Sequence, residues 1–137
     1  HSNVLDIAKD YHIGPQIHLI TDFLADLEVL NRLWLSDVGF LYMPHDTLSS
    51  SSAIRFFISA SLPIVVTPSS HFEDVRRGLI RTGGFSLVDF SRTLWETLHN
   101  APLLKQLRKE TESTYEQFMW TRFGENYLQC YKRAMVG

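Results

Sequence analysis

Apolar residues in this chain alternate between short continuous runs and longer stretches with helical spacing. The runs at residues 17–21, 38–43 and 63–67 are typical of parallel strands that are buried on both faces. Residues 78–82 are a candidate for one more short strand. Residues 26–36 and 53–61, which lie between these runs, have helical patterns. The alternation predicts an α/β fold with a Rossmann-like, doubly wound parallel sheet and right-handed crossovers.

Residues 86–137 predict a helical C-terminal tail. Ser86 is suited to cap a helix, with Asp89 three residues further on, and Asn100 and Pro102 mark the start of the next helix. Cys130 falls on the apolar side of the last helix, which predicts a thiol packed in the core. Three or four strands are few for a sheet. We therefore predict that the whole chain, 1–137, is a single domain and that part of its sheet lies upstream.

Composition narrows the classes of function. The chain has 137 residues with 45% apolar residues, a net charge of -2 and a pI near 6.3, which argues against nucleic acid as a partner. A single cysteine allows no internal disulfide and favours a cytoplasmic location. No apolar run approaches the roughly 20 residues of a transmembrane segment. The six histidines have no paired ligand spacing, so we expect no metal. The sequence contains neither a GxGxxG motif nor a P-loop, and we expect no other cofactor.

Four consecutive serines, 49–52, separate an apolar run from the helix expected at Ala53. Ligands of doubly wound sheets bind beyond the carboxyl ends of the strands, where this loop is expected. The free N–H groups of a helix N-terminus favour phosphate, and small side chains allow an anion to approach the backbone. The alternative is that Ser50 or Ser51 is an ordinary N-cap.

The order of these segments resembles a known family. "DIAKDYHIGPQIHLITDFLADLEVLNRLWLSDVGFLYMP", followed by "SSSSAIRFFISASLPIVVTPSSHFEDV", is similar to the second half of the C-terminal domain of retaining GT-B glycosyltransferases, in the group 1 and glycogen-phosphorylase-like superfamily. The final "YEQFMWTRFGENYLQCYKRAM" is similar to the closing helices of that domain. The resemblance covers most of the chain and depends on the order of the segments rather than on one motif.

The resemblance implies a transferase that binds a nucleoside diphosphate sugar and transfers the sugar, with retention, to an unidentified acceptor. It places the donor diphosphate at four consecutive residues, Ser50, Ser51, Ser52 and Ala53. It places the nucleobase beside Ile20, Thr21 and Asp22. Asp46 and Glu73 are the weak candidates for catalytic or sugar contacts. We interpret Asp37 as structural, and Ser70 with Glu73 equally fits a helix start.

The chain also departs from the family. Many members carry two glutamates around the loop, and those positions correspond to Leu48 and Phe56 here. Asp46 is the nearest carboxylate, and Arg55 lies beside the second position. The missing part of the enzyme would be a partner, and the chain alone is expected to be inactive. Two alternatives stay open: a non-catalytic binding or assembly module derived from such a domain, and a flavodoxin-like regulatory domain.

Overall fold

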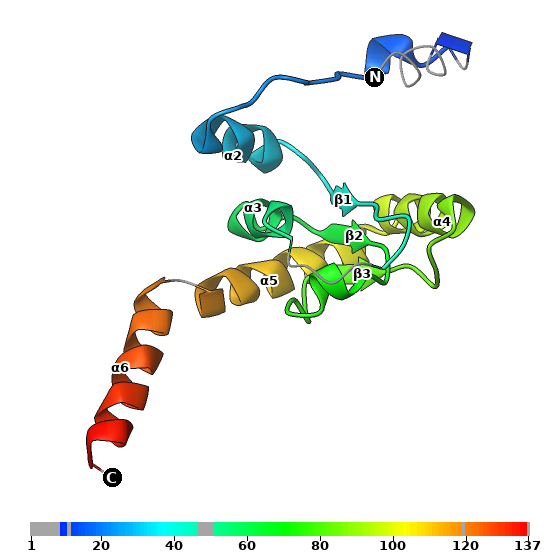
Figure 1. Cartoon of the computed structure of the whole chain (residues 1–137). Coiled ribbons are helices and arrows are strands. Elements are labelled where there is room, and N and C mark those ends of the chain that lie inside the picture. The colour runs from blue at the N-terminus through cyan, green and yellow to red at the C-terminus, as the bar shows by residue number, and fades with distance from the viewer. Residues whose placement is uncertain (1–8, 11, 47–50, 119, 137) are drawn as a thin grey trace.

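The computed structural model describes residues 9–10, 12–46, 51–118 and 120–136. Strands β1 (Gly39–Leu41), β2 (Ile64–Val66) and β3 (Leu79–Arg81) form a parallel sheet in the order β1-β2-β3 (Figure 1). Phe40 lies opposite Val65, and Val65 lies opposite Ile80. The strands expected at 38–43, 63–67 and 78–82 are therefore confirmed, each a little shorter than its apolar run.

The prediction of a strand at residues 17–21 is wrong for this structure. These residues have no regular secondary structure, and Leu19 and Ile20 are 41% and 44% exposed. A strand exists only when its backbone groups pair with a neighbour, and no strand in the described ranges lies beside this segment. An apolar run indicates a strand but does not supply the partner.

Helices connect and flank the strands. They are α2 (Asp26–Trp34), α3 (Ala53–Ser59), α4 (Leu87–Leu98), α5 (Ala101–Phe118) and α6 (Trp120–Val136), with 3₁₀ turns η1 (Gly14–Gln16) and η2 (Ser70–Phe72). The helices expected from apolar spacing are thus present. The chain has a mixed α/β fold with a helical C-terminal region.

The two faces of the sheet are covered by different helices. On one face, Ile54 and Ile58 of α3 belong to the same buried cluster as Ile64 and Val66 of β2. On the other face, the Phe90 ring of α4 makes edge-to-face contacts, with centroids 5.8 Å from Phe40 and 5.3 Å from Tyr42. The side chains of β2 are completely buried because helices lie on both of its faces and strands on both of its sides.

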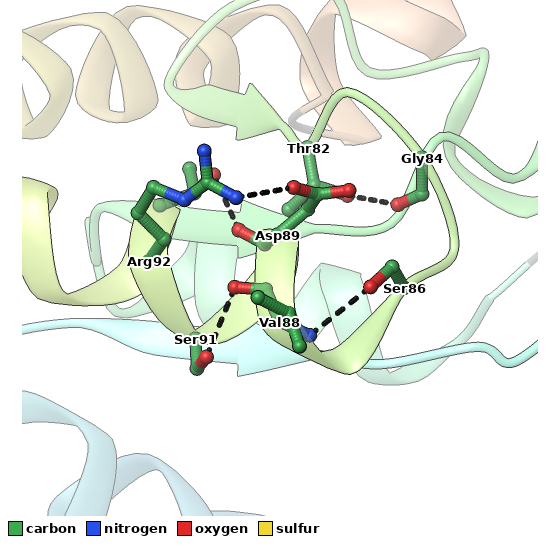
Figure 2. A network of polar contacts seen from close by, with 8 residues as sticks. Thr82, Gly84, Ser86, Val88, Asp89, Ser91 and Arg92 are labelled. Carbon is green, nitrogen blue, oxygen red and sulfur yellow. Dashed lines mark hydrogen bonds and ion pairs between the residues drawn. The ribbon is translucent and has the colours of Figure 1, made fainter.

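The start of α4 confirms the cap that the sequence predicts. The Ser86 hydroxyl accepts a hydrogen bond from the Val88 N–H at 3.2 Å, as Figure 2 shows. The Asp89 carboxylate instead accepts a hydrogen bond at 2.8 Å from Arg92, one turn further along the helix. Just before this cap, the Thr82 hydroxyl donates to the Gly84 carbonyl at 2.6 Å and closes the turn that follows β3.

Helix α5 lies across the amino-terminal ends of β2 and β3. Thr111 is completely buried, and its hydroxyl lies 3.2 Å from the Gly78 carbonyl oxygen and 3.3 Å from the Leu62 carbonyl oxygen. Gly78 has a φ of +79°, and a Cβ atom there would lie 2.8 Å from both the Cα and the N atom of Thr111. The helix can approach the strand ends this closely only because Gly78 has no side chain.

A carboxylate also connects α5 to this turn. The Gly78 N–H donates to the Glu110 carboxylate at 3.1 Å, and the Gln106 amide donates to the same carboxylate at 2.9 Å. The Gln106 hydrogen bond, the Gly78 hydrogen bond and the positive charge of Arg77 together hold the pKa of Glu110 below its ordinary value. Partial burial acts against this shift without reversing it.

Helix α6 extends away from the sheet (Figure 1). Cys130 is exposed on it, and Tyr127 and Tyr131 are 62% and 66% exposed. The prediction that Cys130 is a packed core thiol is therefore wrong in this structure. Helical spacing identifies the apolar side of α6, but whether another element covers that side depends on the tertiary arrangement.

We expect Gly78→Ala to lower the free energy of unfolding by about 3 kcal/mol or more, since it combines a strained positive φ with overlap against α5. Gly83→Ala is the matched control because a Cβ at Gly83 meets nothing within 4 Å. Urea denaturation of both variants measures the difference. Equal stabilities would contradict the close approach of α5.

We expect Glu110→Gln to lower stability by about 1 kcal/mol at neutral pH, because it removes the charge from two hydrogen bonds. The pKa of Glu110 is lower in the folded state, so the stabilisation is complete above the ordinary value of 4.5 and disappears as the pH falls through the folded pKa. Denaturation between neutral and acidic pH should therefore show the wild type and the variant converging in acid. If the difference in free energy of unfolding between wild type and variant stays constant across that pH range, the charge of Glu110 is not what stabilises the folded state.

Candidate functional site

The loops that leave the carboxyl ends of β1 and β2 are joined by hydrogen bonds. The Met43 N–H donates to the Thr67 hydroxyl at 3.0 Å, and the Thr67 N–H donates to the Leu41 carbonyl at 3.3 Å. Thr67 is completely buried. Its hydroxyl continues the β1–β2 pairing one step beyond the last strand residues, so both loops start from a fixed position.

Asp46 connects the two loops further out. One of its carboxylate oxygens accepts hydrogen bonds from the Ser69 hydroxyl at 3.0 Å, the Ser70 N–H at 2.7 Å and the Ser70 hydroxyl at 2.9 Å. Hydrogen bonds to an ionised carboxylate are short and comparatively strong. A negative charge is thus held at the carboxyl edge of the sheet.

The cap in the second loop differs from the one expected. Ser69 rather than Ser70 is the N-cap of η2, and its hydroxyl accepts from the His71 N–H at 3.3 Å. Ser69 is almost completely buried, whereas Glu73 is exposed at the end of the turn. The reason is that Asp46, which is 23 residues away from Ser69 in the sequence, binds both serines and sets their orientation.

The predicted diphosphate residues lie at the start of α3, next to these loops. Ser50, like Leu48, lies outside the described residues. The Ser51 N–H donates to the His71 carbonyl at 3.4 Å, which ties the start of α3 to the second loop. The N-cap is Ser52 rather than Ser50 or Ser51, and its side chain makes no capping hydrogen bond. Ala53 is the first residue of the helix, as expected.

The first turn of α3 determines what this edge can bind. The first backbone hydrogen bond of the turn runs from the Arg55 N–H to the Ser52 carbonyl at 3.0 Å. The Ala53 N–H precedes it and has no carbonyl within the helix to bind, and Ala53 is exposed, whereas Ile54 is completely buried. Such an N–H suits an anion or a polar ligand oxygen. The helix has only seven residues, so its own dipole contribution is modest.

The residues predicted on the nucleobase side are not brought to this edge. Ile20, Thr21 and Asp22 are exposed in the segment before α2, which lies apart from the sheet in Figure 1. Their predicted place depends on residues 17–21 forming a strand of the same sheet. That strand is not formed. The structure therefore places Asp46, Ser51, Ser52 and Ala53 at the carboxyl edge of the sheet, whereas Ile20, Thr21 and Asp22 lie elsewhere.

Arg55 takes part in an arrangement that the sequence did not indicate. Its guanidinium forms an ion pair with Asp74 and lies 4.2 Å from the centroid of the Phe118 ring. Next to this pair is a shallow pocket of about 290 Å³, lined by Asp74, Arg76, Arg77, Thr114, Gln117 and Phe118. Asp74 and Phe118 are far from Arg55 in the sequence, so no local pattern signals their contact with it.

The described residues contain neither a group suited to bind a metal ion nor a helix suited to span a membrane. Within the described ranges, no group of three or more His, Cys, Asp or Glu side chains is placed to hold a metal ion. Over the same ranges, no helix is long and apolar enough to span a membrane. Comparisons with known protein families, curated proteins and solved structures found no match to this chain. The geometry of the carboxyl edge is therefore the best indication of what the chain does.

We expect Asp46→Ala to loosen the two loops, because three donors lose their shared acceptor. The free energy of unfolding should fall by about 1–3 kcal/mol, because the buried Ser69 hydroxyl loses its acceptor even though Asp46 itself is exposed. Amide exchange at Ser70 should become faster. Asp22→Ala, which removes an exposed carboxylate from the segment before α2, is the control. Unchanged exchange at Ser70 would show that Asp46 does not hold the loop.

Proposed function

We propose that the chain is part of the nucleotide-sugar-binding domain of a retaining GT-B glycosyltransferase. The activity proposed is transfer of a sugar, with retention, from a nucleoside diphosphate sugar to an unidentified acceptor. The observation that carries the proposal is the junction of the two loops at Asp46, next to the first turn of α3. Catalysis would also need the parts of such an enzyme that these residues do not supply.

The topology supports this proposal. Parallel strands in sequential order, with α3 on one face and α4 on the other, are compatible with one side of a Rossmann-like, doubly wound sheet. In such sheets, ligands bind beyond the carboxyl ends of the strands. Asp46 and the start of α3 are at that edge, whereas α5 covers the opposite edge through Thr111.

The chemistry of the edge fits a sugar nucleotide better than a simple anion. The Ala53 N–H would donate a hydrogen bond to a diphosphate oxygen, with small serine side chains around it. The Asp46 carboxylate would repel a phosphate but can accept hydrogen bonds from sugar hydroxyls. Glu73, which is exposed after η2, is the other carboxylate available for that contact. The transition state would be stabilised mainly by fixed donors facing the leaving diphosphate.

A non-catalytic binding or assembly module is the second candidate, and two features favour it. Phe56 is half-buried, so the second expected glutamate position contributes an apolar side chain to packing. The Asp46 oxygen that accepts three hydrogen bonds already has a structural role. In a binding module, the same edge would hold the nucleotide sugar without promoting transfer.

Nucleotide titration of the natural polypeptide that contains these residues tests the proposal. We expect uridine or guanosine diphosphate to bind in calorimetry, and the double variant Ser51→Leu/Ser52→Leu to weaken binding at least about tenfold by blocking access to the first turn of α3. Cys130→Ala is the control because its exposed thiol lies on α6, which extends away from the sheet. It should leave binding unchanged.

Release of the sugar from a nucleotide sugar donor separates the two candidates. Binding together with transfer, both reduced by the double leucine change, supports the glycosyltransferase. Binding without transfer supports the non-catalytic module. If the wild type binds no diphosphate at millimolar concentration, or the folded double variant binds as tightly as the wild type, the diphosphate site is rejected.

A further inference from the structure

Two adjacent arginines line the shallow pocket that lies next to the Arg55–Asp74 ion pair. The pocket has a volume of about 290 Å³ and lies between residues 74–77, which lead into β3, and the second half of α5. Arg76 and Arg77 are both exposed there. Neither of them forms an ion pair with another residue that the structure describes. Their donors are therefore available to a ligand.

Two carboxylates next to this pocket already have partners. Asp74, which lines the pocket, forms its ion pair with Arg55. The Glu110 carboxylate accepts two hydrogen bonds, and the charge of Arg77 acts on it without forming an ion pair. The pocket thus keeps an excess of positive charge. Because Arg76 and Arg77 carry like charges, an anion bound between them would relieve their repulsion.

The backbone that carries the two arginines is held in place on both sides. The Arg81 guanidinium donates to the Phe72 carbonyl at 2.7 Å and to the Val75 carbonyl at 2.9 Å, which fixes the chain just before the arginines. Gly78, with its φ of +79°, bends the chain just after them. In an extended chain, successive side chains point to opposite sides, whereas this bend allows both arginines to line one pocket. A site that is fixed in advance loses less conformational entropy on binding.

Helix α5 supplies the other side of the pocket. The Thr114 hydroxyl donates to the Glu110 carbonyl at 2.8 Å, so this buried threonine contributes a small surface rather than a donor. Gln117 is exposed, and its side-chain amide can donate to an anion. Phe118 adds an aromatic surface, with the Arg55 guanidinium 4.2 Å from its ring centroid. Helix α5 therefore offers one polar donor and an apolar contact.

The number and kind of donors favour a phosphate group. A guanidinium can form two parallel N–H···O bonds with phosphate oxygens. Two guanidinium groups suit a ligand group with several oxygens and nearly two negative charges, as a phosphate monoester has at neutral pH. The volume of the pocket lies at the lower end of the roughly 300–1,000 Å³ that is usual for small-molecule sites. The ligand should therefore be small.

We propose that the pocket at Arg76 and Arg77 binds the phosphate group of inorganic phosphate or of a small phosphate monoester. The two guanidinium groups hold the phosphate oxygens, and Gln117 donates to one of them. The organic part of an ester would lie against Phe118. Of the residues proposed to bind the nucleotide sugar, none is among the described residues that line this pocket. The phosphate site is thus separate from the start of α3.

Calorimetric titration of the natural polypeptide with inorganic phosphate and with glycerol 3-phosphate, in the absence of nucleotide, tests the proposal. We expect one saturable site with a Kd of about 1 mM or lower. The double variant Arg76→Gln/Arg77→Gln should raise this Kd at least about tenfold, because it removes both charges and both pairs of donors. Arg92→Gln, which removes an exposed arginine of α4, is the matched control and should change the Kd less than about twofold.

Two further measurements locate the binding. Phosphate should shift the amide signals of residues 76–78 and 114–118, and the Ser51→Leu/Ser52→Leu variant should bind it as the wild type does. If the double arginine variant does not fold, Arg76→Gln alone should still raise the Kd at least about threefold. Tighter binding of the ester identifies a monoester as the ligand, and equal or weaker binding of the ester identifies inorganic phosphate.

Four results would overturn the proposal. They are the absence of saturable binding at about 10 mM, unchanged binding by the folded arginine variants, an equal loss in Arg92→Gln, and a loss confined to the double serine variant. The last result would assign the phosphate to the start of α3. Failure of a nucleoside diphosphate to bind rejects the donor site but leaves the phosphate titration unaffected, so the two failures are distinguishable.

Discussion

The packing of Thr111 against Gly78 is the constraint on which much of this structure depends. It brings α5 against the beginning of β3, and the Thr111 hydroxyl also lies 3.3 Å from the Leu62 carbonyl just before β2. Helix α5 therefore packs against the amino-terminal ends of two strands. With that edge closed by a helix, the polar loops gather at the opposite edge. Catalysis or binding at the carboxyl edge would take place on a sheet whose opposite edge is held by α5.

Asp46 gives the carboxyl edge its chemical character. It converts two separate loops into one polar surface, and it introduces a negative charge beside the first turn of α3. These two features divide the edge between different ligand groups, since free N–H groups attract phosphate whereas a carboxylate attracts hydroxyls. A molecule that carries both a diphosphate and a sugar satisfies both parts. The same carboxylate also joins the loops, so its proposed binding role would coincide with a structural role in one residue.

The proposed donor site is divided between two parts of the chain. The residues proposed for the diphosphate side lie at the start of α3, at the carboxyl edge of the sheet. Residues 20–22, which are proposed for the base side, lie in a segment that this structure leaves exposed, so they provide no surface beside the start of α3.

The sequence by itself determined the local elements and their order. Apolar runs predicted all three strands of the sheet, helical spacing predicted the helices, and Ser86 predicted where α4 begins, because each of these depends on neighbouring residues. For the site, the sequence indicated the start of α3 and the nearby carboxylate, but not that Asp46 binds Ser69 and Ser70. Only the tertiary structure decided that residues 17–21 remain unpaired, that Cys130 is exposed and that Arg55 pairs with Asp74. Strand pairing, burial and ion pairs all require partners that are distant in the sequence, and periodicity carries no information about which distant segments meet.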